Sequence, residues 1–190
     1  PFRARTLGAD LISVSAHKVH GIKGAGALYI RPGLSLPPFV LGGGQESGLR
    51  SGTEGLPAIA AFAAACRAAL PKRTESIARQ RRLLAQAQEL LRAIDGVQLL
   101  GAQEAPHILN LAVPGVRSQG LINALQERDI YVSAGSACSK GHRSHVLEAL
   151  HLPPAVIDGS VRVSFSGDNT EADVDALVEA LLEAKQTLKG

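Results

Sequence analysis

The chain has 190 residues, of which 45% are hydrophobic and 19% are charged. This balance excludes a disordered or fibrous chain, and the two widely separated cysteines exclude a disulfide-stapled secreted scaffold and a four-thiolate metal site. A formal charge of +3 is too small to indicate nucleic-acid binding, and the sequence contains neither a long apolar run nor a signal-peptide pattern. We therefore expect a cytoplasmic protein with no direct nucleic-acid contact and no membrane contact.

The first part of the chain is rich in loops. Residues 11–15 and 27–30 are typical of short strands, and the glycine-rich connection between them predicts a hairpin. Residues 32–44 are rich in proline and glycine, and residues 45–53 are polar, so both segments are expected to be irregular. Two short strands do not provide a self-sufficient core. This part therefore suggests that the chain is the later part of a longer protein.

From residue 56 onward, helical and strand patterns alternate. Helical spacing begins at Leu56, Pro71 is expected to interrupt or kink that helix, and residues 73–94 predict a second, long amphipathic helix. The later segments predict strands at 97–100, 108–113, 130–133 and 160–165. They also predict a helix capped by Ser118 and a short helix at 145–150. In the last helix, Thr170 and Asp173 resemble a capping box at the N-terminus. The alternation indicates an α/β domain with helices packed on a sheet.

Lys18 is the first candidate for chemistry. It follows the first predicted strand in the run Ser15-Ala16-His17-Lys18, and glycine-rich backbone comes after it. Partial burial lowers the pKa of a lysine and frees its amine to attack a carbonyl, and neighbouring hydroxyl, imidazole and glycine amide groups can hold a phosphate. The alternative is a lysine that points into water at a strand end, which spacing alone favours.

Cys138 is the second candidate. Its small neighbours leave the thiol uncrowded, and Lys140, His142 and Arg143 follow within five positions and favour the thiolate. The alternative is a small buried hydrophobic residue, the common position of a free cysteine. Cys66, which follows three alanines in a helical segment, is expected to be such a core residue.

Three basic segments are weaker candidates. Arg162 lies between apolar residues of a predicted strand and either binds an anion, such as a carboxylate, or faces solvent, as strand alternation slightly favours. Residues 50–53 carry hydroxyl and amide groups suited to a phosphate, but such strings are common in turns. Residues 67–82 hold six basic residues against one acidic residue, which usually indicates a solvated helix face and less often a docking surface for RNA or an acidic protein.

Taken together, these motifs resemble the pyridoxal-phosphate cysteine desulfurases of the NifS/IscS type. Residues 15–18 and 21–29 resemble the family's Schiff-base lysine motif, and residues 42–46 and 50–54 resemble the signature that follows it. Residues 136–139 resemble the persulfide loop, residues 144–147 the helix after it, and residues 161–164 the strand that binds the substrate carboxylate. The resemblance implies an α/β protein that contains the end of a PLP fold type I large domain in residues 1–62. A complete small C-terminal domain of α/β (α+β) type would occupy residues 63–190.

The resemblance also implies an activity, in which sulfur is removed from L-cysteine to give L-alanine and an enzyme persulfide. The cofactor would be pyridoxal 5'-phosphate, bound to Lys18, which would then move protons at the α-carbon. Arg162 would bind the substrate carboxylate, and Cys138 would attack the substrate sulfur. The residues implied to contact the cofactor phosphate are Ser15, His17 and Thr53, the last across the interface of a homodimer.

The implied sulfur acceptors are an Fe–S scaffold or a tRNA-thiolating protein, and no metal ligands are expected. Two alternatives remain: another enzyme of the same cofactor fold, such as an aminotransferase or a selenocysteine lyase, and a non-catalytic half-domain that docks a sulfur acceptor. Members of the family are about twice as long as this chain, and the residues that contact the cofactor ring lie in their first half. The chain alone is therefore expected to be incomplete and to hold the cofactor poorly.

Overall fold

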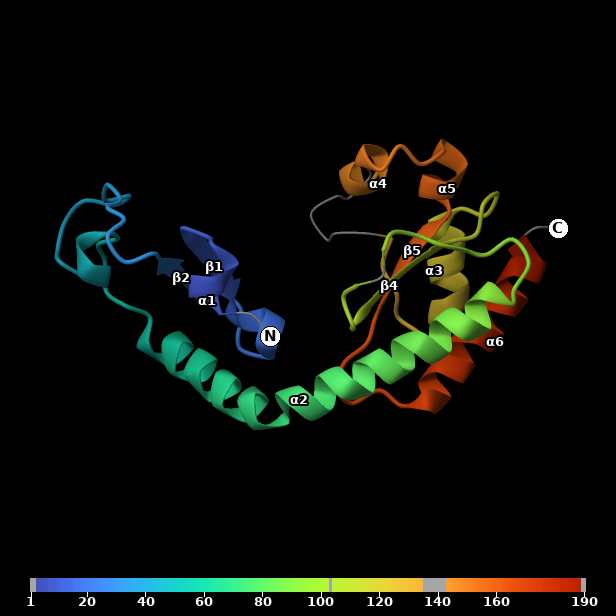
Figure 1. Ribbon diagram of the computed structural model, residues 1–190, viewed down its shortest axis with the longest axis horizontal. Coiled ribbons are helices and arrows are strands. Elements are labelled where there is room, and N and C mark those ends of the chain that lie inside the picture. Colours follow the sequence, from blue (N-terminus) through green and yellow to red (C-terminus); the bar gives the residue numbers. More distant parts are fainter. Residues whose placement is uncertain (1–2, 103, 135–142, 189–190) are drawn as a thin grey trace. The chain divides into compact units, whose positions relative to one another are not determined.

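The computed structural model describes residues 3–102, 104–134 and 143–188. It divides into two compact units, Pro1–Arg73 and Thr74–Gly190 (Figure 1). The long helix α2 (Leu56–Arg92) begins in the first unit and ends in the second. The domain boundary expected after residue 62 lies within this helix and stays a prediction. Among the described residues, no helix is both long enough and apolar enough to cross a membrane.

The first unit is built around one antiparallel hairpin. Leu11 pairs with Ile30, and Ser15 pairs with Gly26, which confirms the hairpin expected from the sequence. The elements of this unit before α2 are α1 (Ala4–Leu7), β1 (Leu11–Ser15), the 3-10 turn η1 (Ala16–Val19), β2 (Gly26–Ile30) and the 3-10 turn η2 (Glu46–Gly48). The turn η2 lies in a segment that we expected to be irregular throughout.

Apolar side chains of the first unit are mostly exposed. Among the described residues of this unit, Ala16 is the one hydrophobic residue that is fully buried. Phe39 is 92% exposed, Leu41 is 82% exposed, and Leu28 in β2 is 52% exposed. The unit thus lacks a core of its own, as its sequence predicts.

The second unit contains an antiparallel sheet in the order β3-β4-β5. Its strands are β3 (Gln98–Leu99), β4 (Ile108–Ala112) and β5 (Ser160–Ser164), each within a segment expected to be a strand. The segment 130–133, also expected to be a strand, contributes a single bridge between Ser133 and Arg162 at the free edge of β5. The helices that accompany the sheet are the last part of α2 together with α3 (Ser118–Gln126), α4 (His145–Ala149), α5 (Pro154–Asp158) and α6 (Glu171–Leu188).

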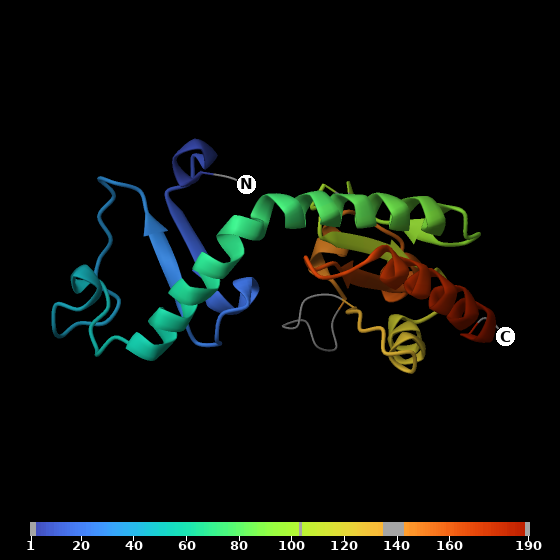
Figure 2. The ribbon, with the colours of Figure 1, turned by 90° about the horizontal axis from the view of Figure 1, so that it is seen from below.

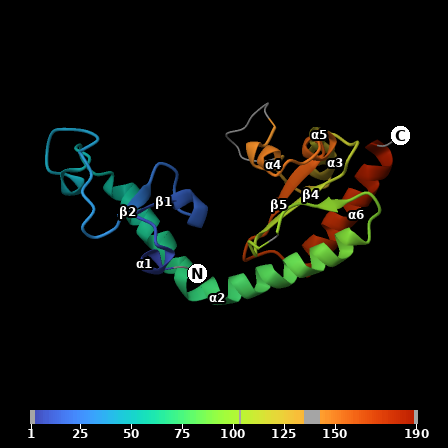
Figure 3. The same cartoon turned by 45° about the horizontal axis from the view of Figure 1, so that its top comes forward.

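Helices cover the two faces of this sheet unequally. The main core joins one face to α2, α3 and α6, and includes Leu84 of α2, Leu109 of β4 and Leu181 of α6. A smaller cluster on the other face joins Ala112 to Val156 of α5. Figure 3 shows α4 and α5 on one side of β4 and β5 with α6 on the other, and Figure 2 shows α3 beside α6. The expected α/β architecture of this part of the chain is confirmed.

Two expectations about helices are wrong. We expected Pro71 to interrupt or kink the helix and residues 73–94 to form a separate one. Instead α2 is one helix that continues through Pro71, so the separate helix is wrong, whereas the kink stays a prediction. Proline removes one helical hydrogen bond, and the alanine-rich residues before it have a helix propensity high enough to keep the helix continuous. We also expected Ser118 to cap α3, but the cap position is Arg117, which has extended backbone angles, and Ser118 is already helical.

Candidate functional site

The turn that carries Lys18 follows β1 directly. Lys18 lies in η1, and the turn closes through a 2.8 Å hydrogen bond from the Gly21 amide to the Ala16 carbonyl. Ala16 is fully buried, whereas the side chains of Ser15, His17 and Lys18 are exposed. The chain therefore brings these three polar side chains together on one exposed turn, and Lys18 lacks partial burial within this chain.

Two glycines permit the close packing of this turn. A β-carbon at Gly26 would lie 2.5 Å from the carbonyl oxygen of Val14, and one at Gly21 would lie 2.9 Å from the carbonyl oxygen of Ala16. Both contacts are with backbone atoms, so a larger residue would force the hairpin and the turn apart. The glycine-rich sequence after Lys18 thus holds the lysine turn against the end of β1.

The segment that carries Thr53 is folded back on itself. Ser51, which is buried, donates a 2.6 Å hydrogen bond from its hydroxyl to the Gly43 carbonyl. The Gly52 amide donates a 3.3 Å hydrogen bond to the Gln45 side-chain oxygen. These bonds fix the backbone just before Thr53, whose own side chain is exposed. Lys18 and Thr53 both belong to the first unit.

Arg162 belongs to the second unit and is the central residue of β5. Its side chain is half-buried, and its Nε atom is buried without a hydrogen-bond partner among the described residues. Alternation slightly favoured an arginine that faces solvent, and the structure shows a half-buried side chain instead of a fully exposed one. A buried guanidinium N–H without an acceptor is costly, and a bound anion such as a carboxylate would supply the acceptor.

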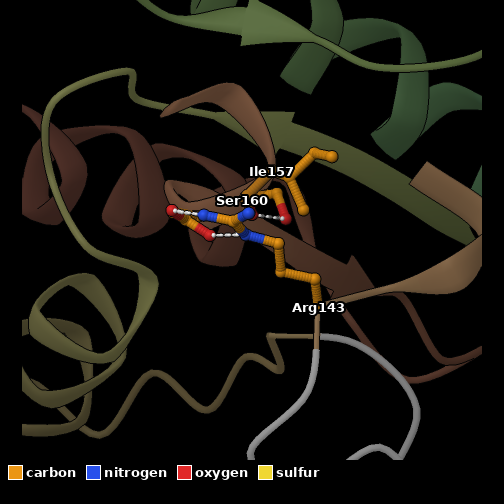
Figure 4. A network of polar contacts seen from close by, with 4 residues as sticks. Arg143, Ile157 and Ser160 are labelled. Carbon is orange, nitrogen blue, oxygen red and sulfur yellow. Dashed lines mark hydrogen bonds and ion pairs between the residues drawn. The ribbon is translucent and has the colours of Figure 1, made fainter. Parts of the chain in front are cut away.

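Arg143 makes a bidentate ion pair with Asp158 at the end of α5 (Figure 4). Its Nε and one terminal nitrogen each lie 2.6 Å from an Asp158 oxygen. The hydrogen bonds from Arg143 lower the pKa of Asp158, and the same contact raises the pKa of Arg143. We expected Arg143 to favour the thiolate of Cys138, but its charge is already matched by a carboxylate, which weakens that interpretation.

The expected nucleophile Cys138 lies outside the described residues. Cys66, expected in the core, is half-buried in α2. No group of three or more His, Cys, Asp or Glu side chains in the described part of the chain is arranged to hold a metal ion. The described candidates thus consist of one exposed lysine turn, one threonine segment and one half-buried arginine.

Comparison with known proteins assigns the family. The model of the class-V aminotransferases matches residues 1–177. The chain belongs to this family. A NifS/IcsS protein homolog from Lactobacillus delbrueckii is 40% identical over 186 residues, which are 95% of this chain and 48% of that relative. A cysteine desulfurase from Nostoc is 34% identical over 194 residues, with 100% of this chain and 48% of the relative covered.

Solved structures support the same fold. A NifS-like protein superposes with a TM-score of 0.86 at 34% identity, covering 99% of this chain and 49% of that chain. A NifS-like protein from Rickettsia africae superposes with a TM-score of 0.87 at 28% identity. These neighbours confirm the expected α/β fold class, that of the PLP fold type I proteins. The 190-residue chain spans about half the length of the curated relatives that it matches.

Two polar features were not identified from the sequence. Asn110 lies directly opposite Arg162 in the sheet, and Asp158 neutralises Arg143. Strand alternation can place Asn110 on the face away from the core, but the register that pairs it with Arg162 depends on distant segments of chain. The partner of Arg143 is 15 residues away in a short helix that we did not predict.

Proposed function

We propose that this chain is the C-terminal half of a cysteine desulfurase that uses pyridoxal 5'-phosphate to convert L-cysteine and a protein thiol into L-alanine and a protein persulfide. The observation that carries the proposal is the match, over nearly the whole chain, to relatives named cysteine desulfurases. Because the chain covers about half of each of them, the activity belongs to a protein completed by the other half.

The residues present fit the cofactor in part. Lys18 offers an exposed amine on a tightly held turn, and Ser15 and His17 beside it offer polar groups for the phosphate. Thr53 would contribute its hydroxyl to the phosphate of the second subunit in a homodimer. When bound, pyridoxal phosphate withdraws electrons from the α-carbon of an amino acid. In this proposal residues 1–62 are the end of the cofactor domain and residues 63–190 are the small domain.

Lys18 would hold the cofactor through its amine and, once released, move a proton at the substrate α-carbon. Lys18 is exposed in this chain, and in this proposal the other half of the protein supplies walls of its pocket. Covering the amine would favour its neutral form, which is the form that accepts a proton.

Arg162 would bind the α-carboxylate of L-cysteine. Its half-buried side chain and its unpartnered Nε suit a planar anion, which a guanidinium group binds through two parallel hydrogen bonds. The bond orients the substrate and keeps its sulfur available to a second nucleophile. Cys138 would be that nucleophile, forming a sulfur–sulfur bond as the carbon–sulfur bond of the substrate breaks. The persulfide would then pass to an Fe–S scaffold or a tRNA-thiolating protein.

The first test labels the lysine. The chain is combined with the N-terminal half of a class-V relative, loaded with pyridoxal phosphate, reduced with borohydride and mapped by mass spectrometry. We expect one phosphopyridoxyl group on Lys18, none in Lys18→Ala, and normal labelling in Lys23→Ala, a control at an exposed lysine in the connection between η1 and β2. Labelling elsewhere, or none in the completed protein, would overturn the assignment of Lys18.

A second test separates a desulfurase from an aminotransferase. The completed protein is given L-cysteine, and L-alanine and sulfide are measured in Cys138→Ala and in Cys66→Ala. A desulfurase loses alanine formation in the first variant and keeps it in the second, because the thiol at 138 accepts the sulfur. Full alanine formation in Cys138→Ala would contradict the persulfide mechanism. Consumption of L-cysteine without alanine, with its amino group passed to an added 2-oxo acid in both variants, would favour an aminotransferase, which needs no thiol.

A further inference from the structure

Arg162 stands in a row of polar residues that crosses the sheet of the second unit. It pairs with Asn110 of β4 on one side and with Ser133 on the other. Directly paired residues of antiparallel strands place their side chains on the same face. The intervening residues Leu109 and Val163 belong to the main core, so this row lies on the opposite face of the sheet.

The backbone hydrogen bonds show which of the two pairs that Arg162 forms is the hydrogen-bonded one. The Arg162 amide donates a 2.6 Å bond to the Ser133 carbonyl, and the Ser133 amide donates a 3.1 Å bond to the Arg162 carbonyl. Both polar backbone groups of Arg162 are thus used toward Ser133. The Asn110 carbonyl correspondingly accepts a 2.8 Å bond from Leu100, on the side away from Arg162.

Asn110 and Arg162 therefore form a non-hydrogen-bonded pair of the antiparallel ladder. In such pairs the Cα atoms approach to about 4.5 Å and the side chains lie closer together than in the hydrogen-bonded pairs. Both side chains are half-buried, so they share one partly enclosed position on the sheet. A ligand held by the Arg162 guanidinium group lies within reach of the Asn110 amide.

The chemistry of the two side chains is complementary toward a carboxylate. Arg162 brings a positive charge and a buried Nε–H with no acceptor among the described residues. Asn110 brings two uncharged N–H donors on a short side chain. A carboxylate has two oxygens and about four acceptor positions, so it can take two bonds from arginine and one from asparagine at once.

We propose that Asn110 is a second carboxylate-binding residue, which donates a hydrogen bond to the α-carboxylate held by Arg162. This inference rests on the proposed function, in which that carboxylate belongs to L-cysteine. Asn110 adds affinity through this hydrogen bond, and Arg162 supplies the charge.

The test uses the 190-residue chain without cofactor, with sodium acetate as the carboxylate probe. The side-chain Nε–H signal of Arg162 is followed by NMR during the titration and is assigned by its loss in Arg162→Lys. We expect acetate to shift this signal, and Asn110→Ala to weaken the affinity about tenfold, the value typical for one hydrogen bond to a charged group. Asn110→Asp should weaken binding further, because it places a negative charge beside the bound carboxylate.

Ile108→Ala is the matched control, because Ile108 lies on the same face of β4 and pairs with Ser164 instead of Arg162. We expect it to bind acetate as the unchanged chain does. If acetate binding is weakened equally in Asn110→Ala and Ile108→Ala, Asn110 has only a structural role. If Asn110→Ala binds acetate with unchanged affinity, Asn110 does not contact the carboxylate. Either result overturns the inference.

A kinetic measurement on the completed enzyme gives an independent readout. A carboxylate contact of equal strength in the substrate complex and the transition state changes KM and leaves kcat unchanged. We expect Asn110→Ala to raise the KM for L-cysteine about tenfold with little change in kcat, and a fall in kcat alone would contradict the inference. If acetate fails to shift the Arg162 signal in the unchanged chain, the inference about Asn110 is wrong, while labelling of Lys18 still decides the proposed function separately.

Discussion

Two arginines of the second unit differ in what their guanidinium groups contact. Arg143 is matched by the carboxylate of Asp158 through two bonds, whereas the Nε of Arg162 is buried without an acceptor in the described part of the chain. A satisfied ion pair holds structure in place, and an unsatisfied donor can bind a ligand. This difference in hydrogen bonding, more than charge or sequence position, makes Arg162 the better candidate for substrate binding.

The Arg143–Asp158 pair makes the stability of the second unit depend on pH. The hydrogen bond from Arg143 lowers the pKa of Asp158, so folding is favoured by the ionised carboxylate. This contribution is fully present above the ordinary pKa of aspartate and is lost as the pH falls through the lower pKa of the folded state. We expect Asp158→Asn to lower the urea midpoint slightly at pH 7 and to have no effect at strongly acidic pH, measured by circular dichroism.

Asp168→Asn is the control for this measurement. Asp168 is exposed and makes no ion pair with any described residue, so its replacement should leave the midpoint unchanged at both pH values. Because Arg143 and Asp158 are both largely exposed, solvent screens the pair and the effect stays small. A midpoint difference that persists in acid would mean that Asp158 acts through something other than its charge.

At the scale of elements, the first turn of α6 depends on one carboxylate. Asp173 accepts a 2.9 Å hydrogen bond from the Thr170 amide and a 3.1 Å bond from the Asn169 side chain. These bonds lower the pKa of Asp173, with the Thr170 amide as the main cause. Asp173 thus satisfies a backbone donor that the helix itself leaves unpaired, as the glutamate of a capping box does.

Loss of this cap should weaken the second unit measurably. We expect Asp173→Ala to lower the free energy of unfolding by about 1 kcal/mol, the usual effect of losing a helix cap. Urea denaturation followed by circular dichroism measures the change. Glu179→Ala, an exposed acidic residue later in the same helix, should change the free energy of unfolding much less. Equal effects of the two substitutions would show that Asp173 contributes only as a charge.

The strands of the two units should respond differently to the loss of a leucine. Leu109 of β4 is fully buried in the main core, whereas Leu28 of β2 is 52% exposed. We expect Leu109→Ala to lower the free energy of unfolding by about 2–5 kcal/mol, because it removes buried contacts and leaves a cavity. Leu28→Ala should have almost no effect on this chain. The same denaturation assay measures both, and a large loss in Leu28→Ala would mean that β2 is buried in solution.

At the scale of the whole molecule, local sequence patterns predicted the elements better than their contacts. The hairpin at Leu11–Ser15 and Gly26–Ile30 and the strand at Ser160–Ser164 follow from short apolar runs, which depend on neighbouring residues alone. The bridge from Ser133 to Arg162 and the register of Asn110 depend on segments far apart in the chain. Periodicity could therefore identify Arg162 as a candidate but could not show its neighbours.

The two units also differ in whether they can fold without help. Apart from Ala16, the buried hydrophobic residues of the described chain all lie in the second unit. Burial of apolar surface is the main force that stabilises a fold, so this unit holds nearly all of the chain's stability. In the protein proposed above, the other half would cover the exposed apolar side chains of the first unit, Leu28 and Phe39 among them.

This imbalance gives a prediction about a fragment. Residues 74–190 expressed alone should unfold cooperatively in urea, with nearly the same midpoint as the 190-residue chain, because removal of residues 1–73 takes away one buried hydrophobic residue. Hydrogen exchange should show the reverse pattern along the full chain, with slow exchange in β4 and β5 and fast exchange in β1 and β2. A fragment that unfolds without cooperativity, or a hairpin as protected as the sheet, would mean that the first unit contributes a core in solution and that the 190-residue chain is stable as one piece.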